Sequence, residues 1–247
     1  NQYHWSTRIW RVNPQDKYLE PIWNDVQKRT LSAVLKINKI NILTSPKTVG
    51  LAMLNNYFPT TPKKKLRFDY YNGHPEVLFY LNLIHYMFIV RSYSLHKLPE
   101  LYKTYAKGEK ILRDADLETL FLDLGLISAN PSTVANTIYY LKYLEIAYLD
   151  KKLLAIYKNH WLNFIPQNGV DWQNKVYALT HLIIAASYFY QRKADPKDFD
   201  WVFDFFEKNI EEIIANTNSE IISEVGLCYK LCGIKDHTVI DRVILHI

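Results

Sequence analysis

The chain has 247 residues, of which 49% are hydrophobic and 22% charged, with a formal net charge of +5, and this composition excludes a disordered protein. Only 7 residues are Gly while 15% are aromatic, which disfavours a sandwich or barrel with many tight turns. The charge is mild and the sequence contains no zinc-finger spacing, RNA-binding signature or basic zipper helix, so we expect no nucleic-acid partner.

The sequence also bears on membrane insertion and disulfides. It has no uncharged apolar run of about 18 residues, so we expect no transmembrane segment. Cys228 and Cys232 are four residues apart on one predicted helix, where a disulfide has poor geometry, and we interpret them as buried thiols. The chain begins at Asn1 without Met and shows no signal peptide, which is compatible with a removed leader or a trimmed chain.

Helical periodicity dominates the first part of the chain. It predicts a short aromatic helix over residues 1–11 and a second helix over 16–38. A third helix begins with Ser45 as N-cap and Pro46 in its first position. The segment "NKINILTSP" is the best strand candidate, and it is weak because it lacks a clear alternation and a hairpin turn.

A dense basic run follows the third helix and consists of Lys63, Lys64, Lys65 and Arg67. We expect this run to lie in a solvated loop, with binding of an anion or a membrane surface as the alternative. The turn signal "NGHP" comes next, and Pro75 begins a strong helix that continues to about Ser94.

The remaining sequence predicts more helices in close succession. Between Pro99 and Leu126 we expect shorter pieces, and Asp195 or Asp198 is interpreted as a helix cap. Gly233 is expected to terminate the last long helix before a final helical tail that starts at Asp236. The long predicted helices cover residues 129–150, 151–166, 171–187, 196–215 and 219–233.

These elements predict an all-α fold with a single helical domain over residues 1–247. About ten helices joined by short loops favour antiparallel hairpins. Such hairpins either close into an α/α toroid or stack as an irregular α-solenoid. We favour the toroid-like arrangement because the sequence has no sharp repeat of fixed period.

Four segments resemble a known family: "NQYHWSTRIWRVNPQDKYLEPIWNDV", "QNKVYALTHLIIAASYFYQ", "FDWVFDFFEKNIEEII" and "SEIISEVGLCYKLCG". In their order they are similar to a bacterial family known as domain of unknown function 3541, although Ala178 and Leu179 stand where that family favours Gly-Met. The resemblance covers the start and the last third of the chain well and the middle poorly. It implies a bacterial, largely helical, exported protein and implies no activity.

The helix over 171–187 carries the first candidate site residues. Asn174 and His181 are seven residues apart with Ala178 between them, so they share one stripe, which Tyr177 and Thr180 flank. A neutral His both donates and accepts hydrogen bonds, which suits catalysis and also suits a structural bridge. The stripe therefore either lines a polar cavity or ties the core together.

The segment "SEIISEVG" carries the second candidate, a carboxylate among apolar neighbours. Glu220 is explained by its place in the first turn of a helix, where acids are favourable. Glu224 lies one turn deeper and needs a partner, because burying an unpaired carboxylate is costly. If the two helices are neighbours, His181 meets Glu224, and the pair is either acid–base equipment or a structural tie.

The opening helix supplies a third candidate set. His4, Arg8 and Arg11 fall on one face, beside Trp5 and Trp10. Arg with aromatic rings is a frequent lining for carbohydrates and anions, and the alternative is an ordinary amphipathic surface helix.

These candidates lead to two function hypotheses. The first is an exported enzyme that acts on a glycan or related polymer, by analogy with toroidal enzymes, with His181 and Glu224 as catalytic residues. The second is a non-catalytic module that binds a small molecule or a protein partner. We predict no cofactor and no metal site, since the spacing gives little support to a metal set of His4, His181 and Glu224. The expected ligand-binding residues are His4, Trp5, Arg8, Trp10, Arg11, Asn174 and Tyr177.

Overall fold

The structure is a computed structural model that describes residues 15–38, 45–145, 149–235 and 237–247. Over these ranges the chain forms thirteen α-helices and three short 3-10 helices, with no strand. The all-α prediction is therefore confirmed, while the weak strand candidate over 38–46 lies mostly outside the described residues.

The first half of the chain begins its helices at prolines. Proline occupies the first turn of α3, α4, α5 and α6, where its missing N–H costs nothing and its fixed φ favours the helix. Ser45 caps α3 as predicted by accepting a hydrogen bond from Thr48 N. The elements are η1 (Asp16–Tyr18), α2 (Leu19–Asn38), α3 (Pro46–Leu54), α4 (Pro62–Gly73), α5 (Pro75–Ser92), η2 (Leu95–Lys97) and α6 (Pro99–Asp114).

The basic run does not lie in a loop, and that prediction was wrong. Thr61 caps α4 by accepting a hydrogen bond from Lys64 N, and Pro62 stands at the start of the helix. The "TTP" segment is thus a helix start, and the Lys residues after it are good helix formers. All four basic residues therefore belong to one helix, so their spacing decides which face of the helix each side chain occupies.

The second half of the chain contains more breaks than the periodicity indicated. Residues 129–150 do not form one helix, because α9 ends at Leu144 and Glu145 adopts a left-handed φ of 56°. Asp195 caps η3 and Gly233, with φ 79°, follows α13, both as predicted. The elements are α7 (Leu117–Phe121), α8 (Leu124–Ala129), α9 (Pro131–Leu144), α10 (Leu149–Asn163), α11 (Gly169–Ala186), η3 (Pro196–Phe199), α12 (Asp200–Asn216), α13 (Ser219–Leu231) and α14 (Thr238–His246).

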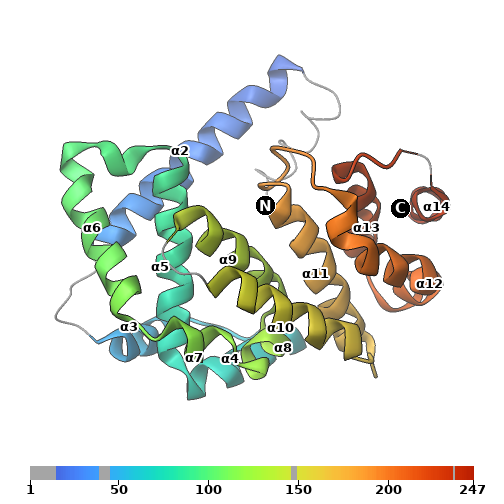
Figure 1. Ribbon diagram of the computed structural model, residues 1–247, viewed down its shortest axis with the longest axis horizontal. Coiled ribbons are helices and arrows are strands. Elements are labelled where there is room, and N and C mark those ends of the chain that lie inside the picture. The colour runs from blue at the N-terminus through green and yellow to red at the C-terminus, as the bar shows by residue number, and fades with distance from the viewer. Residues whose placement is uncertain (1–14, 39–44, 146–148, 236) are drawn as a thin grey trace.

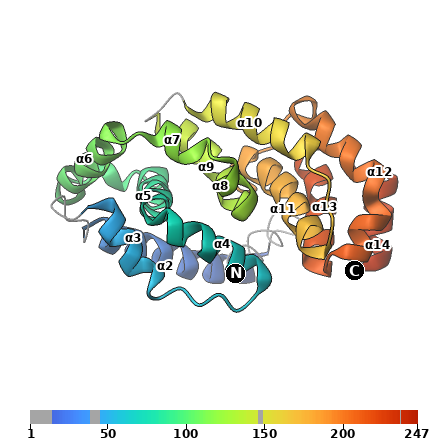
Figure 2. The same ribbon diagram turned by 90° about the horizontal axis from the view of Figure 1, so that it is seen from below.

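Three helices, α5, α9 and α11, form the middle of the molecule (Figure 1). Helix α9 packs against α5, α10 and α11, and α11 packs in turn against α13. Seen from below, the helices follow an arc from α2, α3 and α4 to α12 and α14 (Figure 2). Buried side chains form one cluster that runs from Ala33 to Val243. Closure into a toroid, and the alternative of an irregular solenoid, stay predictions.

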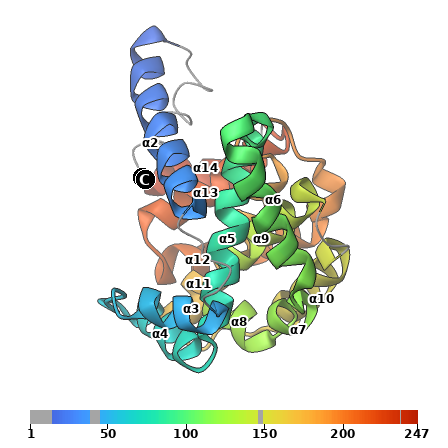
Figure 3. The same cartoon turned by 90° about the vertical axis from the view of Figure 1, so that its left-hand side faces the viewer.

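Helix α2 projects from the rest of the molecule (Figure 3). It packs against α5 and α6, and its buried residues, Ala33 and Ile37, lie in its C-terminal half. Its exposed large side chains include Trp23, which is 61% exposed.

A left-handed turn follows α11. Three consecutive non-glycine residues, Tyr188, Phe189 and Tyr190, have φ values of 51°, 53° and 74°. Ser187 holds the turn, since its Oγ donates to Ile184 O and accepts from Tyr190 N. The ring of Phe189 then packs against Phe88 and Tyr140.

Candidate functional site

Helix α11 is the element that brings the candidate residues together. Asn168 caps it by accepting hydrogen bonds from Val170 N and Asp171 N. The helix packs against α9, α12 and α13 and also contacts α4, so most of its second half is buried. Polar side chains on such a helix meet partners from several directions, because buried polar groups need hydrogen bonds.

Thr180, His181 and Glu224 meet where α11 packs against α13. Thr180 Oγ1 donates to Glu224 Oε2 over 3.0 Å, and His181 Nε2 lies 4.0 Å from the same oxygen. The Glu224 side chain is only 5% exposed, whereas that of His181 is 24% exposed. The proximity that the sequence suggested is thus observed, and of the two side chains His181 is the one that solvent reaches more easily.

The other side of the His181 ring faces α9. His181 Nδ1 lies 3.4 Å from Asn136 Oδ1, and the Tyr177 ring lies beside it with centroids 5.7 Å apart. His181 thus has a polar neighbour at each ring nitrogen, Asn136 at Nδ1 and Glu224 at Nε2, and a neutral imidazole can donate from one nitrogen while it accepts at the other.

Helix α4 contributes a lysine that the sequence did not place here. Lys63 Nζ lies 3.8 Å from the centroid of the Tyr177 ring, in cation–π geometry. Burial, and then the charge of Arg67, lower the pKa of Lys63 to about 8, while Glu224 and Glu220 act in the opposite direction. We call the group formed by Lys63, Asn136, Tyr177, Thr180, His181 and Glu224 the polar junction.

The predicted stripe on α11 is mostly core. Ala178 is 0% exposed and Asn174 is 5% exposed, so neither lies on an open surface. Within the described ranges, Asn174 Oδ1 has no hydrogen-bond partner. Only Tyr177 and His181 of the residues predicted on this helix are partly exposed.

The N-terminal candidates lie outside the described residues. These are His4, Trp5, Arg8, Trp10 and Arg11, all within residues 1–14. Elsewhere in the part of the chain that the structure describes, no three His, Cys, Asp or Glu side chains gather as a metal site would require. The two thiols are buried and not joined in a disulfide, and Cys228 Sγ contacts Thr180 O at 3.7 Å.

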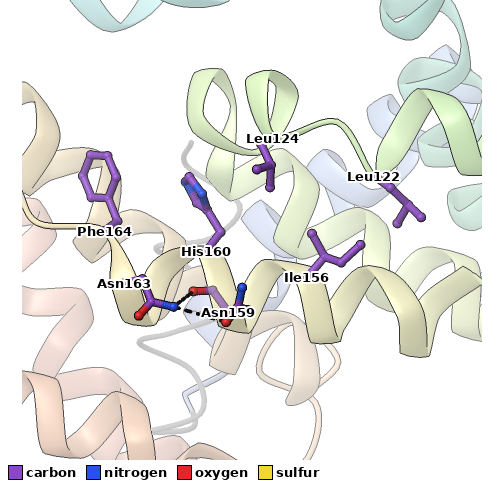
Figure 4. A pocket seen from close by; sticks show the side chains of 7 residues that line it. All are labelled: Leu122, Leu124, Ile156, Asn159, His160, Asn163 and Phe164. Carbon is purple, nitrogen blue, oxygen red and sulfur yellow. Dashed lines mark hydrogen bonds between the residues drawn. The ribbon is translucent and has the colours of Figure 1, made fainter.

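A groove of about 640 Å³ runs beside α10 (Figure 4). His160 forms a pair with Ser128 of α8, with Nε2 and Oγ 3.1 Å apart, and Asn163 donates to Asn159 one turn away. Burial, followed by the charge of Lys175, lowers the pKa of His160. We call this region the α10 groove; it is lined by Leu122, Leu124, Ile156, Asn159, His160, Asn163 and Phe164.

Sequence reasoning missed several of these residues for one physical reason: their roles arise from helices that are distant in the chain. Nothing around Asn136 or Ser128 separates them from other helical polar residues. For Lys63 a signal was available, because Lys63 and Arg67 are four residues apart and therefore share a helix face once "TTP" is understood as a helix start.

Fold and geometry together define an all-α protein with a His–carboxylate pair at a junction of helices. The family model described as Domain of unknown function (DUF3541) matches residues 1–247, so the chain belongs to that family. No curated protein and no solved structure matches the chain. Among the described helices, none has the length and apolar character needed to cross a membrane.

Proposed function

We propose that the protein is an enzyme whose polar junction performs acid–base chemistry on a hydroxyl-rich ligand, a glycan or related polymer. The observation that carries this proposal is the pairing of a buried carboxylate, Glu224, with a partly exposed imidazole, His181, at 4.0 Å. A neighbouring carboxylate stabilises the imidazolium form and so makes His a better base near neutral pH.

The two residues take different parts in the proposal. His181 is the group that a substrate reaches, and it is the proposed catalytic base or acid. Glu224 is nearly sealed and is anchored by Thr180 Oγ1, so it acts as a positioning residue that orients and stabilises the imidazolium. This arrangement favours a mechanism in which one His transfers the proton. It does not favour the double-displacement mechanism of glycosidases, which needs two carboxylates that both reach the substrate.

A non-catalytic binding or protein-interaction module is the second candidate. The contact that favours it is the buried hydrogen bond between Thr180 and Glu224, because such a bond ties α11 to α13 without any ligand. In that case the pair contributes to stability and to nothing else.

The decisive experiment compares Glu224→Gln, Glu224→Asp and His181→Gln with the control Glu212→Gln, which makes the same chemical change on an exposed residue of α12. Each variant is assayed on a panel of glycans for product release, and its thermal unfolding midpoint is measured. We expect Glu224→Gln and His181→Gln to lower turnover roughly 100-fold or more, with Glu224→Asp between them and the wild type.

The folding midpoint separates the two candidates. The amide oxygen that Glu224→Gln introduces would still accept the Thr180 hydrogen bond, so the enzyme hypothesis expects an almost unchanged midpoint with lost turnover. A wild-type protein that turns over no glycan, together with a Glu224→Gln variant that unfolds at a clearly lower temperature, would show that the pair is a structural tie.

We also propose that the protein is exported from a bacterial cell, since the family resemblance implies this location. Fractionation of cells that express the full-length gene with a C-terminal tag tests it. Recovery of the tagged chain only with cytoplasmic markers contradicts export.

A further inference from the structure

The basic run on α4 divides into two pairs with different surroundings. Lys64 and Lys65 are exposed, and they contact Thr60 and Asp69 of their own segment. Lys63 and Arg67, four residues apart, are both partly buried and lie on the other side of the helix. One pair is therefore an ordinary solvated surface, and the other is partly shielded from solvent.

The inner pair, Lys63 and Arg67, carries two positive charges at partly buried positions. Within the described ranges, no carboxylate lies within ion-pair distance of either residue, and Arg67 Nε is buried without an acceptor. Lys63 rests on the ring of Tyr177, which is a weaker partner than a carboxylate. Two partly desolvated cations that lack an anion are unfavourable, and an oxyanion bound beside Lys63 Nζ and the outer part of the Arg67 guanidinium would offset this cost, although the buried Arg67 Nε would stay out of its reach.

The same pair stands at the edge of the polar junction. Lys63 contacts Tyr177, and the Tyr177 ring lies beside His181. The charges of Glu220 and Glu224 also act on Lys63, so the junction has a cationic side on α4 and an acidic side on α13. A ligand that fits both sides has one anionic group and a neutral, hydrogen-bonding remainder.

We propose that Lys63 and Arg67 form an anion subsite of the polar junction, and that the ligand is an acidic carbohydrate whose carboxylate or sulfate group binds between them. This inference rests on the proposed function for the identity of the neighbouring site, and it deepens that function by adding charge to the ligand. Arg67 supplies a forked donor set that suits an oxyanion, and Lys63 supplies a point charge.

Isothermal titration of the whole chain tests the subsite. The probes are an oligogalacturonate, its uncharged methyl ester, and inorganic sulfate. The variants are Lys63→Gln and Arg67→Gln, and the matched controls are Lys64→Gln and Lys65→Gln, which remove the same charge from the same helix. We expect the acid form to bind, the ester to bind at least ten-fold more weakly, and each inner variant to lose roughly ten- to a hundred-fold in affinity.

The results that overturn the inference are equally defined. The subsite is contradicted if the oligogalacturonate and its methyl ester bind with equal affinity. It is also contradicted if the Lys63→Gln and Arg67→Gln variants lose no more affinity than the Lys64→Gln and Lys65→Gln controls. Binding of sulfate with no gain from the oligosaccharide shows a site for free oxyanions and overturns the carbohydrate part.

A failure of the proposed enzymatic function can be distinguished from a failure of the subsite, because turnover and ligand affinity are measured separately. We expect the Glu224→Gln variant to bind the oligogalacturonate with an affinity within about three-fold of the wild type, because anion binding is assigned to Lys63 and Arg67. This expectation is independent of the effect of the variant on turnover. Affinity that depends on Lys63 and Arg67 in a protein without turnover keeps the subsite and removes the enzyme.

Discussion

The polar junction and the α10 groove each contain a histidine beside a hydrogen-bonding partner, and they differ in what surrounds it. In the junction, His181 lies near a buried carboxylate and beside the Tyr177 ring, which a lysine covers. No member of the junction lines the groove. In the groove, His160 lies beside Ser128 in about 640 Å³ of space that has apolar walls and amide side chains. The groove thus provides the open volume, whereas the ionisable side chains are gathered at the junction, in another part of the molecule.

The difference teaches that open space is a weak guide to chemistry here. A Ser–His pair needs a third group that orients the imidazole, and the lining of the groove includes no carboxylate. Burial and the charge of Lys175 lower the pKa of His160, which keeps it neutral near pH 7. The junction offers the charged partner that the groove lacks, and this is why we assign the chemistry to the junction.

The largest expected effect comes from a buried ring that packs against two residues of the groove lining, His160 and Phe164. Trp161 is 1% exposed and packs against His160, Phe164 and Tyr157. Trp161→Ala should lower the free energy of unfolding by about 3–5 kcal/mol, because it leaves a large cavity. Urea unfolding measures this, with Trp23→Ala on α2 as the exposed control. A loss under about 1 kcal/mol would contradict the close packing of this ring.

The next effect concerns a buried hydroxyl of α10 that contacts backbone carbonyls of α9 and α11. Tyr157 is fully buried on α10, and its hydroxyl lies 3.0 Å from Pro131 O and 2.9 Å from Ala178 O. Tyr157→Phe should cost about 1–3 kcal/mol, since it removes the single O–H donor that two buried carbonyls share. The exposed Tyr102→Phe is the control in the same denaturation experiment. If the two variants unfold alike, this hydroxyl does not stabilise the packing of α10 on α9 and α11.

A smaller effect is expected at the groove's own polar pair. Ser128→Ala removes the contact with His160 and should cost about 0.5–1.5 kcal/mol, while leaving any turnover at the junction unchanged. A double-mutant cycle with His160→Gln isolates the coupling between the two side chains. Loss of turnover in Ser128→Ala would contradict our assignment and move the active site into the groove.

The smallest effect is a difference in pH dependence. Because the pKa of Lys63 is lowered to about 8 from 10.5, the unfolded chain binds more protons between these values, and Lys63 makes stability rise with pH in that window. The pKa of His160 is lowered from 6.5, so its contribution is present above pH 6.5 and is lost as pH falls below it.

Unfolding free energies measured across pH separate these groups. Lys63→Met should flatten the rise between about pH 8 and pH 10.5 by less than about 1 kcal/mol, since solvent screens a partly exposed charge. His160→Gln should flatten the dependence of the unfolding free energy on pH only below about pH 6.5. A Lys63→Met curve parallel to the wild type contradicts the lowered pKa. The groups that face Lys63 are Arg67 on α4, Tyr177 on α11, and Glu220 and Glu224 on α13.

The sequence predicted the helices well where local signals act, and less well where tertiary contacts decide. Ser45, Asp195 and Gly233 behave as their residue types indicate. The break after α9 was missed because Glu145 is no turn residue, and Arg91 of α5 holds it by donating to Leu144 O and Glu145 Oε2. That contact joins residues more than fifty positions apart.

For the candidate site too, the sequence indicated some of the residues and not others. Glu224 and His181 stand out because ionisable side chains among apolar neighbours need partners, and the structure places them together. Asn136 carries no such signal, since a polar residue on a half-buried helix is ordinary. The closeness of Lys63 depended on recognising α4 as a helix.

The left-handed turn after α11 has a consequence for how relatives of this chain can be found. Each non-glycine residue there adopts a φ that costs about 1–2 kcal/mol, so the packing of the rings must outweigh it. A glycine would ease the backbone but lose the ring, and a β-branched residue would suit neither need. The three aromatic positions are therefore constrained by the backbone turn as well as by the contacts of their rings, such as that of Arg192 with Tyr188. A search guided only by acid–base residues would pass over them, although they direct the chain from α11 toward the segment that bonds α13 at Leu231 O.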